Sequence, residues 1–127
     1  MRRAGLYWRR GNQDAFVADW VKHLVKMGQV ETGDAFLTGY RKAGMRGACT
    51  VAIELLKKKS RTEYVSPFEF AKYYAAMGDH DHAFEWLERG FTGHSIRMEY
   101  IKTEPLLDGL RTDPRYVDLL RRMGLSQ

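Results

Sequence analysis

The chain repeats part of itself at a shift of 34 residues, and this repeat restricts the possible folds more than any other feature of the sequence. Five residues recur in order and without a gap, namely Phe36, Tyr40, Gly44, Cys49 and Ile53, which return as Phe70, Tyr74, Gly78, Ala83 and Leu87. The apolar residues between them follow a helical period, and no convincing alternating strand pattern is present. A repeat of this length predicts pairs of antiparallel helices stacked on one another.

The best-marked helix pair spans residues 64–97. Its first helix carries a strong start signal, because Ser66 can cap the first turn, Pro67 suits the first helical position and Glu69 completes a capping box. Gly78 is expected to end this helix, since glycine is common just beyond a helix C-terminus. A polar turn and a second apolar helix follow.

Residues 30–63 are predicted to form another helix pair on the same plan. Thr32 or Asp34 supplies its start signal, and Gly44 separates its two helices. Cys49 is small because the two helices are expected to cross most closely there, where a large side chain would force the backbones apart. The pattern therefore predicts that Cys49 is buried.

Residues 1–29 depart from the repeat and are predicted to be a partial or divergent helix pair. Tyr7 and Gly11 precede their counterparts by 33 residues rather than 34. This segment is rich in large apolar side chains, namely Leu6, Tyr7, Trp8, Phe16 and Trp20. If they leave apolar area uncovered, they favour a homodimer through the N-terminal hairpin or docking on another domain.

Residues 98–127 are predicted to cap the C-terminal end of the array. A short helix is expected over residues 96–102, and a final helix begins at Asp113-Pro114, which supplies an N-cap carboxylate and a proline in the first turn. The inward face of that helix is expected to consist of Tyr116, Val117, Leu120 and Met123. Such an end piece covers the stacking face that the last repeat would otherwise expose.

The order of the repeated residues resembles the tetratricopeptide repeat, whose period is 34. The tail, with Ala83-Phe84-Glu85-Trp86-Leu87-Glu88 and Asp113-Pro114-Arg115-Tyr116, is similar to the C-terminal end of many bacterial tetratricopeptide regulators and kinases. The resemblance implies an all-α fold, a right-handed superhelix of antiparallel helix pairs with a C-terminal capping helix, forming one domain over residues 1–127. It also implies a non-catalytic interaction module, the sensory or scaffold end of a bacterial regulator.

The same resemblance implies where a partner would bind, because the first helix of each tetratricopeptide pair lines a concave groove. The outward residues of those helices are Trp8, Arg9, Asp34, Thr38, Arg41, Lys42, Phe68 and Lys72. Mixed aromatic and basic side chains suit an extended peptide with acidic groups or a C-terminal carboxylate, held by charge-assisted hydrogen bonds. The favoured function is therefore protein–protein interaction, with a peptide or a partner domain in the groove.

The net charge of +5 and an isoelectric point near 9.4 make nucleic acid the alternative partner. The basic residues occur in small groups that stretches with acidic residues separate. Lys57 to Lys59 are expected to close a helix, where cations complement the carbonyl end of the helix dipole and remain solvated. Nucleic acid is thus the less favoured partner, and phosphate binding through the basic patches is kept as the alternative function.

Membrane insertion and disulfide formation are both disfavoured. The apolar runs fall far below the roughly 18 residues that a membrane span requires. Cys49 is the only cysteine, so neither an intrachain disulfide nor a cysteine-based zinc site can form. These features favour a cytoplasmic protein.

Candidate catalytic and metal-binding groups are few. The run Asp79-His80-Asp81-His82 is the one crowded set of potential metal ligands, but it occupies a predicted turn, where adjacent side chains point in different directions. Cys49 is interpreted as a packing residue rather than a nucleophile. No phosphate loop, nucleophile elbow or zincin motif is present. The sequence therefore predicts no enzyme activity, no cofactor and no metal.

Overall fold

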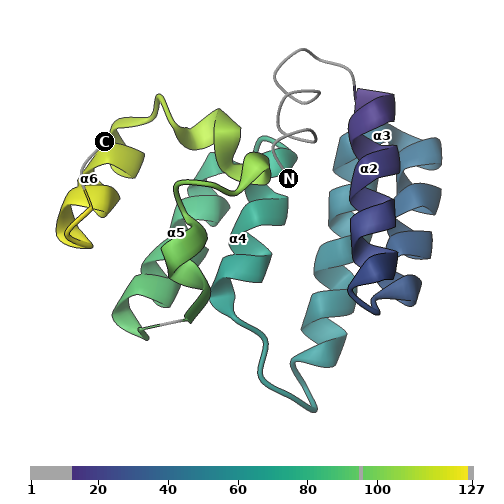
Figure 1. Cartoon of the computed structure of the whole chain (residues 1–127), viewed down its shortest axis with the longest axis horizontal. Coiled ribbons are helices and arrows are strands. Elements are labelled where there is room, and N and C mark those ends of the chain that lie inside the picture. The colour runs from purple at the N-terminus through teal and green to yellow at the C-terminus, as the bar shows by residue number, and fades with distance from the viewer. Residues whose placement is uncertain (1–12, 95, 126–127) are drawn as a thin grey trace. The chain divides into compact units, whose positions relative to one another are not determined.

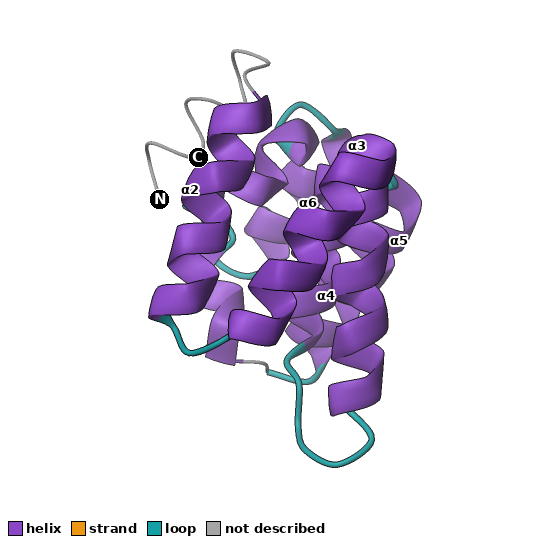
Figure 2. Ribbon diagram, turned by 90° about the vertical axis from the view of Figure 1, so that its right-hand side faces the viewer, coloured by secondary structure: helices purple, strands orange, loops and turns teal. Residues whose placement is uncertain are grey.

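The structure, a computed structural model, describes residues 13–94 and 96–125 (Figure 1). The regular elements are α2 (Gln13–Lys26), α3 (Val30–Lys59), α4 (Pro67–Ala76), α5 (His80–Thr92), the 3₁₀ helices η1 (Ile96–Tyr100) and η2 (Pro105–Leu110), and α6 (Pro114–Arg122). These residues include no strand (Figure 2), so the predicted all-α class is confirmed. Two compact units divide the chain, Met1–Val65 (unit 1) and Ser66–Gln127 (unit 2).

Within unit 1, α3 is a helical hairpin rather than one straight helix. The backbone leaves the helical region at Ala43, with φ −147°, and at Gly44, with φ 68° and ψ −157°. Glycine suits position 44 because a positive φ strains residues that carry a Cβ atom. The first arm covers residues 30–42 and the second arm residues 45–59, on either side of the break that the repeat predicts.

The two arms of α3 touch backbone to backbone at Gly39 and Gly47. A Cβ atom at Gly39 would lie 2.6 Å from the carbonyl oxygen of Gly47, and one at Gly47 would lie 2.5 Å from the carbonyl oxygen of Gly39. Neither position has room for a side chain. Cys49 is fully buried, as predicted. The pattern did not indicate the glycine pair that lets the arms come so close.

Helix α2 packs on α3 through an apolar face and one polar link. Phe16 and Trp20 are buried and their rings stack with centroids 6.1 Å apart, so the expectation that they leave apolar area uncovered is wrong. The Tyr40 hydroxyl donates a hydrogen bond to the Asp14 carboxylate, which raises the pKa of Tyr40 to about 12. The other apolar residues of the predicted dimer surface lie outside the described residues, namely Leu6, Tyr7 and Trp8.

In unit 2, α4 and α5 form an antiparallel pair whose register is set by aromatic rings. Phe70 stacks on Trp86 with centroids 4.2 Å apart, and Tyr74 stacks on His82 at 5.1 Å. Later residues of α4 therefore contact earlier residues of α5, as expected for an antiparallel pair. Offset stacking of this kind adds to the free energy gained from burying the rings.

Three predicted helix boundaries in unit 2 are confirmed. The Ser66 hydroxyl accepts a hydrogen bond of 3.3 Å from the N–H of Phe68 and so caps α4. That helix ends just before Gly78. Asp113 caps α6, because its carboxylate accepts a hydrogen bond of 2.9 Å from the N–H of Arg115.

Helix α6 lies against α5 in the register of the 34-residue repeat. Arg115 forms an ion pair of 2.9 Å with Asp81, and Arg122 donates a hydrogen bond of 2.9 Å to Glu88. Both pairs join residues 34 positions apart. The predicted cap therefore keeps the spacing of the repeat, although its own residues do not match the repeated pattern. The buried residues of α6 are Tyr116, Leu119 and Leu120, of which Leu119 was not predicted.

The segment between α5 and α6 holds two short 3₁₀ helices. The first, η1, lies where a short helix was predicted, whereas η2 was not predicted. Tyr116 fastens this segment to α6, because its hydroxyl donates a hydrogen bond of 3.2 Å to the carbonyl of Ile101 and accepts one of 2.7 Å from Arg111. The apolar residues Leu106, Leu107 and Leu110 of η2 are fully buried.

Candidate interaction surface

Four of the predicted groove residues share one exposed face on the first arm of α3. Asp34, Thr38, Arg41 and Lys42 are all exposed, and we refer to them as the α3 strip. Their spacing places them within one side of a helix, since residues three and four positions apart are neighbours on its surface. The strip is therefore a continuous polar surface of unit 1.

The charged groups of the α3 strip are available to a ligand. Within the described part of the chain, Asp34, Arg41 and Lys42 make no ion pair. Two cations and one carboxylate thus face solvent on a single helical arm. An exposed arginine can bind a carboxylate through two parallel hydrogen bonds, which gives direction as well as attraction.

The expectation that Phe68 and Lys72 point outward is wrong. Phe68 is 2% exposed and belongs to the apolar core of unit 2. Lys72 is 8% exposed, with its Nζ atom 3.0 Å from the Glu69 carboxylate and 4.0 Å from that of Glu104. Burial raises the pKa of Glu104, and the charge of Lys72 acts against that shift.

The physical reason is that α4 is covered on more than one side. It packs against α5 and also against η1 and η2. A helix with a single covered face would expose the positions of Phe68 and Lys72. The last two predicted groove residues, Trp8 and Arg9, lie outside the described residues.

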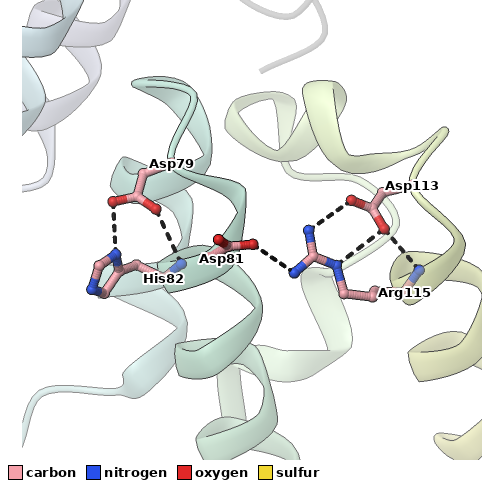
Figure 3. Close-up of polar contacts among 5 residues, drawn as sticks. All are labelled: Asp79, Asp81, His82, Asp113 and Arg115. Carbon is pink, nitrogen blue, oxygen red and sulfur yellow. Dashed lines mark hydrogen bonds and ion pairs between the residues drawn. The ribbon is translucent and has the colours of Figure 1, made fainter.

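The acidic and histidine-rich run at the start of α5 has partners within unit 2 (Figure 3). The Asp79 carboxylate accepts a hydrogen bond of 3.2 Å from the N–H of His82 and lies 2.7 Å from its Nδ1 atom. Asp81 pairs with Arg115, whose guanidinium also holds Asp113 at 3.0 Å. The described residues include no group of three or more metal-ligating side chains placed to hold an ion.

The charges around Arg115 reinforce one another. Hydrogen bonds from Arg115 lower the pKa of Asp113, and Asp113 together with Asp81 raises the pKa of Arg115. These shifts stabilise the charged forms of Asp113 and Arg115. Asp81 and Asp113 therefore join α5 to α6 through one guanidinium (Figure 3).

Cys49 is unsuited to nucleophilic chemistry. Its side chain is fully buried, and burial raises the pKa of its thiol to about 12. The reactive form of cysteine is the thiolate, which is almost absent at neutral pH when the pKa is so high. Cys49 acts as a small apolar packing residue in the second arm of α3.

A concavity that sequence reasoning missed lies in unit 1, between the start of the first arm of α3 and the end of its second arm. We refer to it as the end pocket; its volume is about 400 Å³. Its lining residues are Gly28, Gln29, Val30, Glu31, Thr32, Leu55, Lys58, Lys59, Thr62 and Glu63. The two lining segments are more than 20 residues apart in the sequence, so no local pattern could have indicated the end pocket.

Comparisons with protein-family models, with curated proteins and with solved structures find no match to this chain. In the described ranges, no helix combines the length and the apolar character needed to cross a bilayer. Any function assigned to the α3 strip therefore depends on the geometry and charge of its own residues.

Proposed function

We propose that this chain is a non-catalytic protein-interaction module of tetratricopeptide type, in which the α3 strip holds an extended peptide or a partner domain. The observation that carries the proposal is the strip itself, which exposes Asp34, Arg41 and Lys42 on one helical face with no ion-pair partner among the described residues. A solvated charge normally costs free energy to bury, so a face of this kind favours a partner that brings opposite charges.

A tetratricopeptide-like superhelix is supported by the positions of the helices. Gly44 and the turn that begins at Gly78 separate helices at the predicted spacing, and α6 pairs with α5 through contacts 34 residues apart. Repeated hairpins present one helix of each pair on the same surface. The right-handed superhelix, the cytoplasmic location and the role as the sensory or scaffold end of a bacterial regulator belong to this proposal.

The favoured partner of the α3 strip is a peptide with carboxylate groups. Arg41 and Lys42 can bind such groups through charge-assisted hydrogen bonds. Asp34 lies about two turns away on the same arm and can accept a hydrogen bond from a backbone or side-chain N–H of the ligand. This pairing of opposite charges sets the direction in which the peptide lies.

Binding of nucleic acid through its phosphates is the second candidate function, and the high positive charge of unit 1 favours it. Unit 1 has 13 lysines and arginines against 6 aspartates and glutamates, a formal charge of +7. The carboxylate of Asp34 disfavours nucleic acid on the α3 strip, because it would repel the phosphates that approach Arg41.

The proposal is tested by selecting binders from a library of random 12-residue peptides and measuring an enriched peptide by fluorescence anisotropy. Arg41→Glu is expected to weaken binding about tenfold or more, since it replaces an attraction with a repulsion. Arg121→Glu is the matched control, because Arg121 is also exposed and makes no ion pair among the described residues. Circular dichroism verifies that both variants are folded.

Equal loss of binding in the Arg41 and Arg121 variants would show that only net charge matters and would contradict a binding site on the α3 strip. Failure to enrich any peptide whose binding depends on Arg41 would also contradict it. A 24-base-pair duplex DNA measured in the same assay decides the second candidate. Nucleic-acid binding should fall by several powers of ten between about 50 and 200 mM salt if several phosphates are neutralised.

A further inference from the structure

The end pocket lies in unit 1 at the side opposite the Gly44 turn, between the start and the end of the α3 hairpin. Val30 and Leu55 contribute apolar atoms to its lining, and Lys58 and Lys59 contribute positive charge. Its volume of about 400 Å³ falls within the range of sites that hold small molecules or side chains. The end pocket is therefore large enough to receive one or two side chains of a partner.

Exposed apolar residues lie at the turn from α2 to α3, which contributes Gly28, Gln29 and Val30 to the lining of the end pocket. Val25, Met27 and Val30 lie along the turn from α2 to α3 and are 45%, 56% and 51% exposed. Three large apolar side chains left in water at one turn mark a surface on which a partner can gain free energy by burial. Met27 also adapts its shape easily, because its side chain is unbranched.

The charge around the end pocket is positive. Glu31 and Glu63 balance Lys58 and Lys59 within the lining, and the excess comes from Lys26, Lys57 and Arg61, which adjoin it in the sequence. None of these cations forms an ion pair within the described residues. The helix dipoles contribute little, because the N-terminus of one arm and the C-terminus of the other meet here with opposite partial charges.

We infer that the end pocket and its apolar rim bind an acidic segment of another protein, with an aliphatic side chain in the concavity and its carboxylates beside Lys58 and Lys59. Charge complementarity identifies the partner as acidic, and Val25, Met27 and Val30 require that it also be apolar. This surface shares no residue with the α3 strip, so the inference goes beyond the function proposed for the strip.

Other occupants fit the same surface less well. Duplex DNA presents phosphates but no aliphatic side chain that could enter the concavity or cover Val25, Met27 and Val30. An anionic bilayer is flat and cannot enter a concavity. A second copy of this chain would have to offer the carboxylates of unit 2, yet residues such as Asp81 and Glu88 are already paired with arginines.

The test uses the full chain and a fluorescein-labelled peptide of nine residues, one central leucine flanked by four glutamates on each side. Binding is measured by fluorescence anisotropy at 150 mM salt, where charges farther apart than about 8 Å are largely screened. Lys58→Gln is expected to weaken binding about two- to fivefold, the effect of losing one exposed ion pair. Arg46→Gln is the matched control, because Arg46 is exposed in the same unit but lies beside the Gly44 turn and does not line the end pocket.

Two further variants separate charge from packing. Lys58→Arg keeps the positive charge and should bind the peptide as the unchanged chain does. Val30→Ser in the chain, or serine in place of the central leucine in the peptide, should each weaken binding about tenfold, because apolar burial is lost in both cases. Arg41→Glu should change binding less than twofold, so this inference can hold or fail separately from the proposal for the α3 strip.

Three outcomes would overturn the inference. The first is no peptide binding even at 50 mM salt. The second is an equal loss in the Arg46 and Lys58 variants, which would indicate attraction by net charge alone. The third is tighter binding of a 24-base-pair duplex DNA, or of phosphatidylserine vesicles, than of the peptide in the same assay. Unchanged melting temperatures in all variants exclude unfolding as the cause of lost binding.

Discussion

The two units of this chain use charge in opposite ways. Unit 1 carries a formal charge of +7, and its lysines and arginines between residues 13 and 65 make no ion pair in the structure. Unit 2 has 8 lysines and arginines against 10 aspartates and glutamates, a charge of −2. Four of its arginines are held by carboxylates, namely Arg89, Arg111, Arg115 and Arg122. The comparison separates cations that stabilise a fold from cations that face solvent.

In unit 2 the paired arginines also cover aromatic rings. Arg115 lies 4.6 Å from the centre of the Phe84 ring, and Arg122 lies 5.6 Å from that of Phe91. Each guanidinium thus combines an ion pair with a contact to the face of an aromatic ring. A terminal helix of nine residues gains lateral support in this way.

The largest difference between the two units is expected when one lysine in each is replaced by glutamate, which reverses its charge. Lys72→Glu should lower the free energy of unfolding by about 3–5 kcal/mol, because it removes the cation between Glu69 and Glu104 and places a further carboxylate in a nearly buried position beside them. Lys59→Glu in unit 1 should change it by less than about 1 kcal/mol, since Lys59 is exposed. Urea unfolding followed by circular dichroism measures both. Equal effects would show that the two units do not differ in this respect.

The next prediction concerns unit 1, whose hairpin depends on a backbone contact rather than on ion pairs. Gly39→Ala should destabilise unit 1 by about 1–3 kcal/mol, because the added methyl group collides with the backbone of Gly47. Gly33→Ala is the matched control in the same arm, where a Cβ atom would lie 3.5 Å or more from its neighbours. That change should be neutral or stabilising by about 0.5–1 kcal/mol, because alanine favours a helix over glycine.

Cys49 provides the measurement for this pair of variants, because it is the only thiol of the chain and lies in unit 1. Its reaction with a disulfide reagent at pH 8 should be slow in the native protein, since burial holds the pKa of the thiol near 12. Gly39→Ala should speed the reaction about five- to 150-fold, in proportion to the population of the opened state. A rate unchanged by Gly39→Ala would contradict the tight contact between the arms.

The sequence was most informative where structure is set by neighbouring residues. The break at Gly44 and the caps at Ser66 and Asp113 follow from backbone geometry and from hydrogen bonds within a few residues, so the printed order of residues is enough to predict them. The exposure of Asp34 and Arg41, which the resemblance to the tetratricopeptide repeat implied, is confirmed.

Prediction failed where distant segments meet. Phe68 and Lys72 were expected on an exposed face because the resemblance places the first helix of each pair along an open groove. Instead η2, formed by residues with no repeat signal, covers a second side of α4. The end pocket is bounded by the turn before α3 and by the end of its second arm, and neither segment indicates the other. The helical period of apolar residues predicts which face of a helix is covered. It does not predict how many other elements pack against that helix.

The smallest expected effect tests whether charge really joins α6 to α5. Arg115→Ala should lower the melting temperature slightly at pH 7. Because Arg115 lowers the pKa of Asp113, the contribution of this carboxylate is complete above its unfolded pKa, near 4, and is lost as pH falls through the lower folded value. The difference between Arg115→Ala and the unchanged chain should therefore shrink as pH falls below about 4. Lys57→Ala in unit 1 removes a cation that pairs with no described residue, and it should have no effect at either pH. An equal loss of melting temperature at pH 7 and at low pH would show that Arg115 acts through its contact with the Phe84 ring instead. The contrast between the two units would then depend on packing rather than on charge.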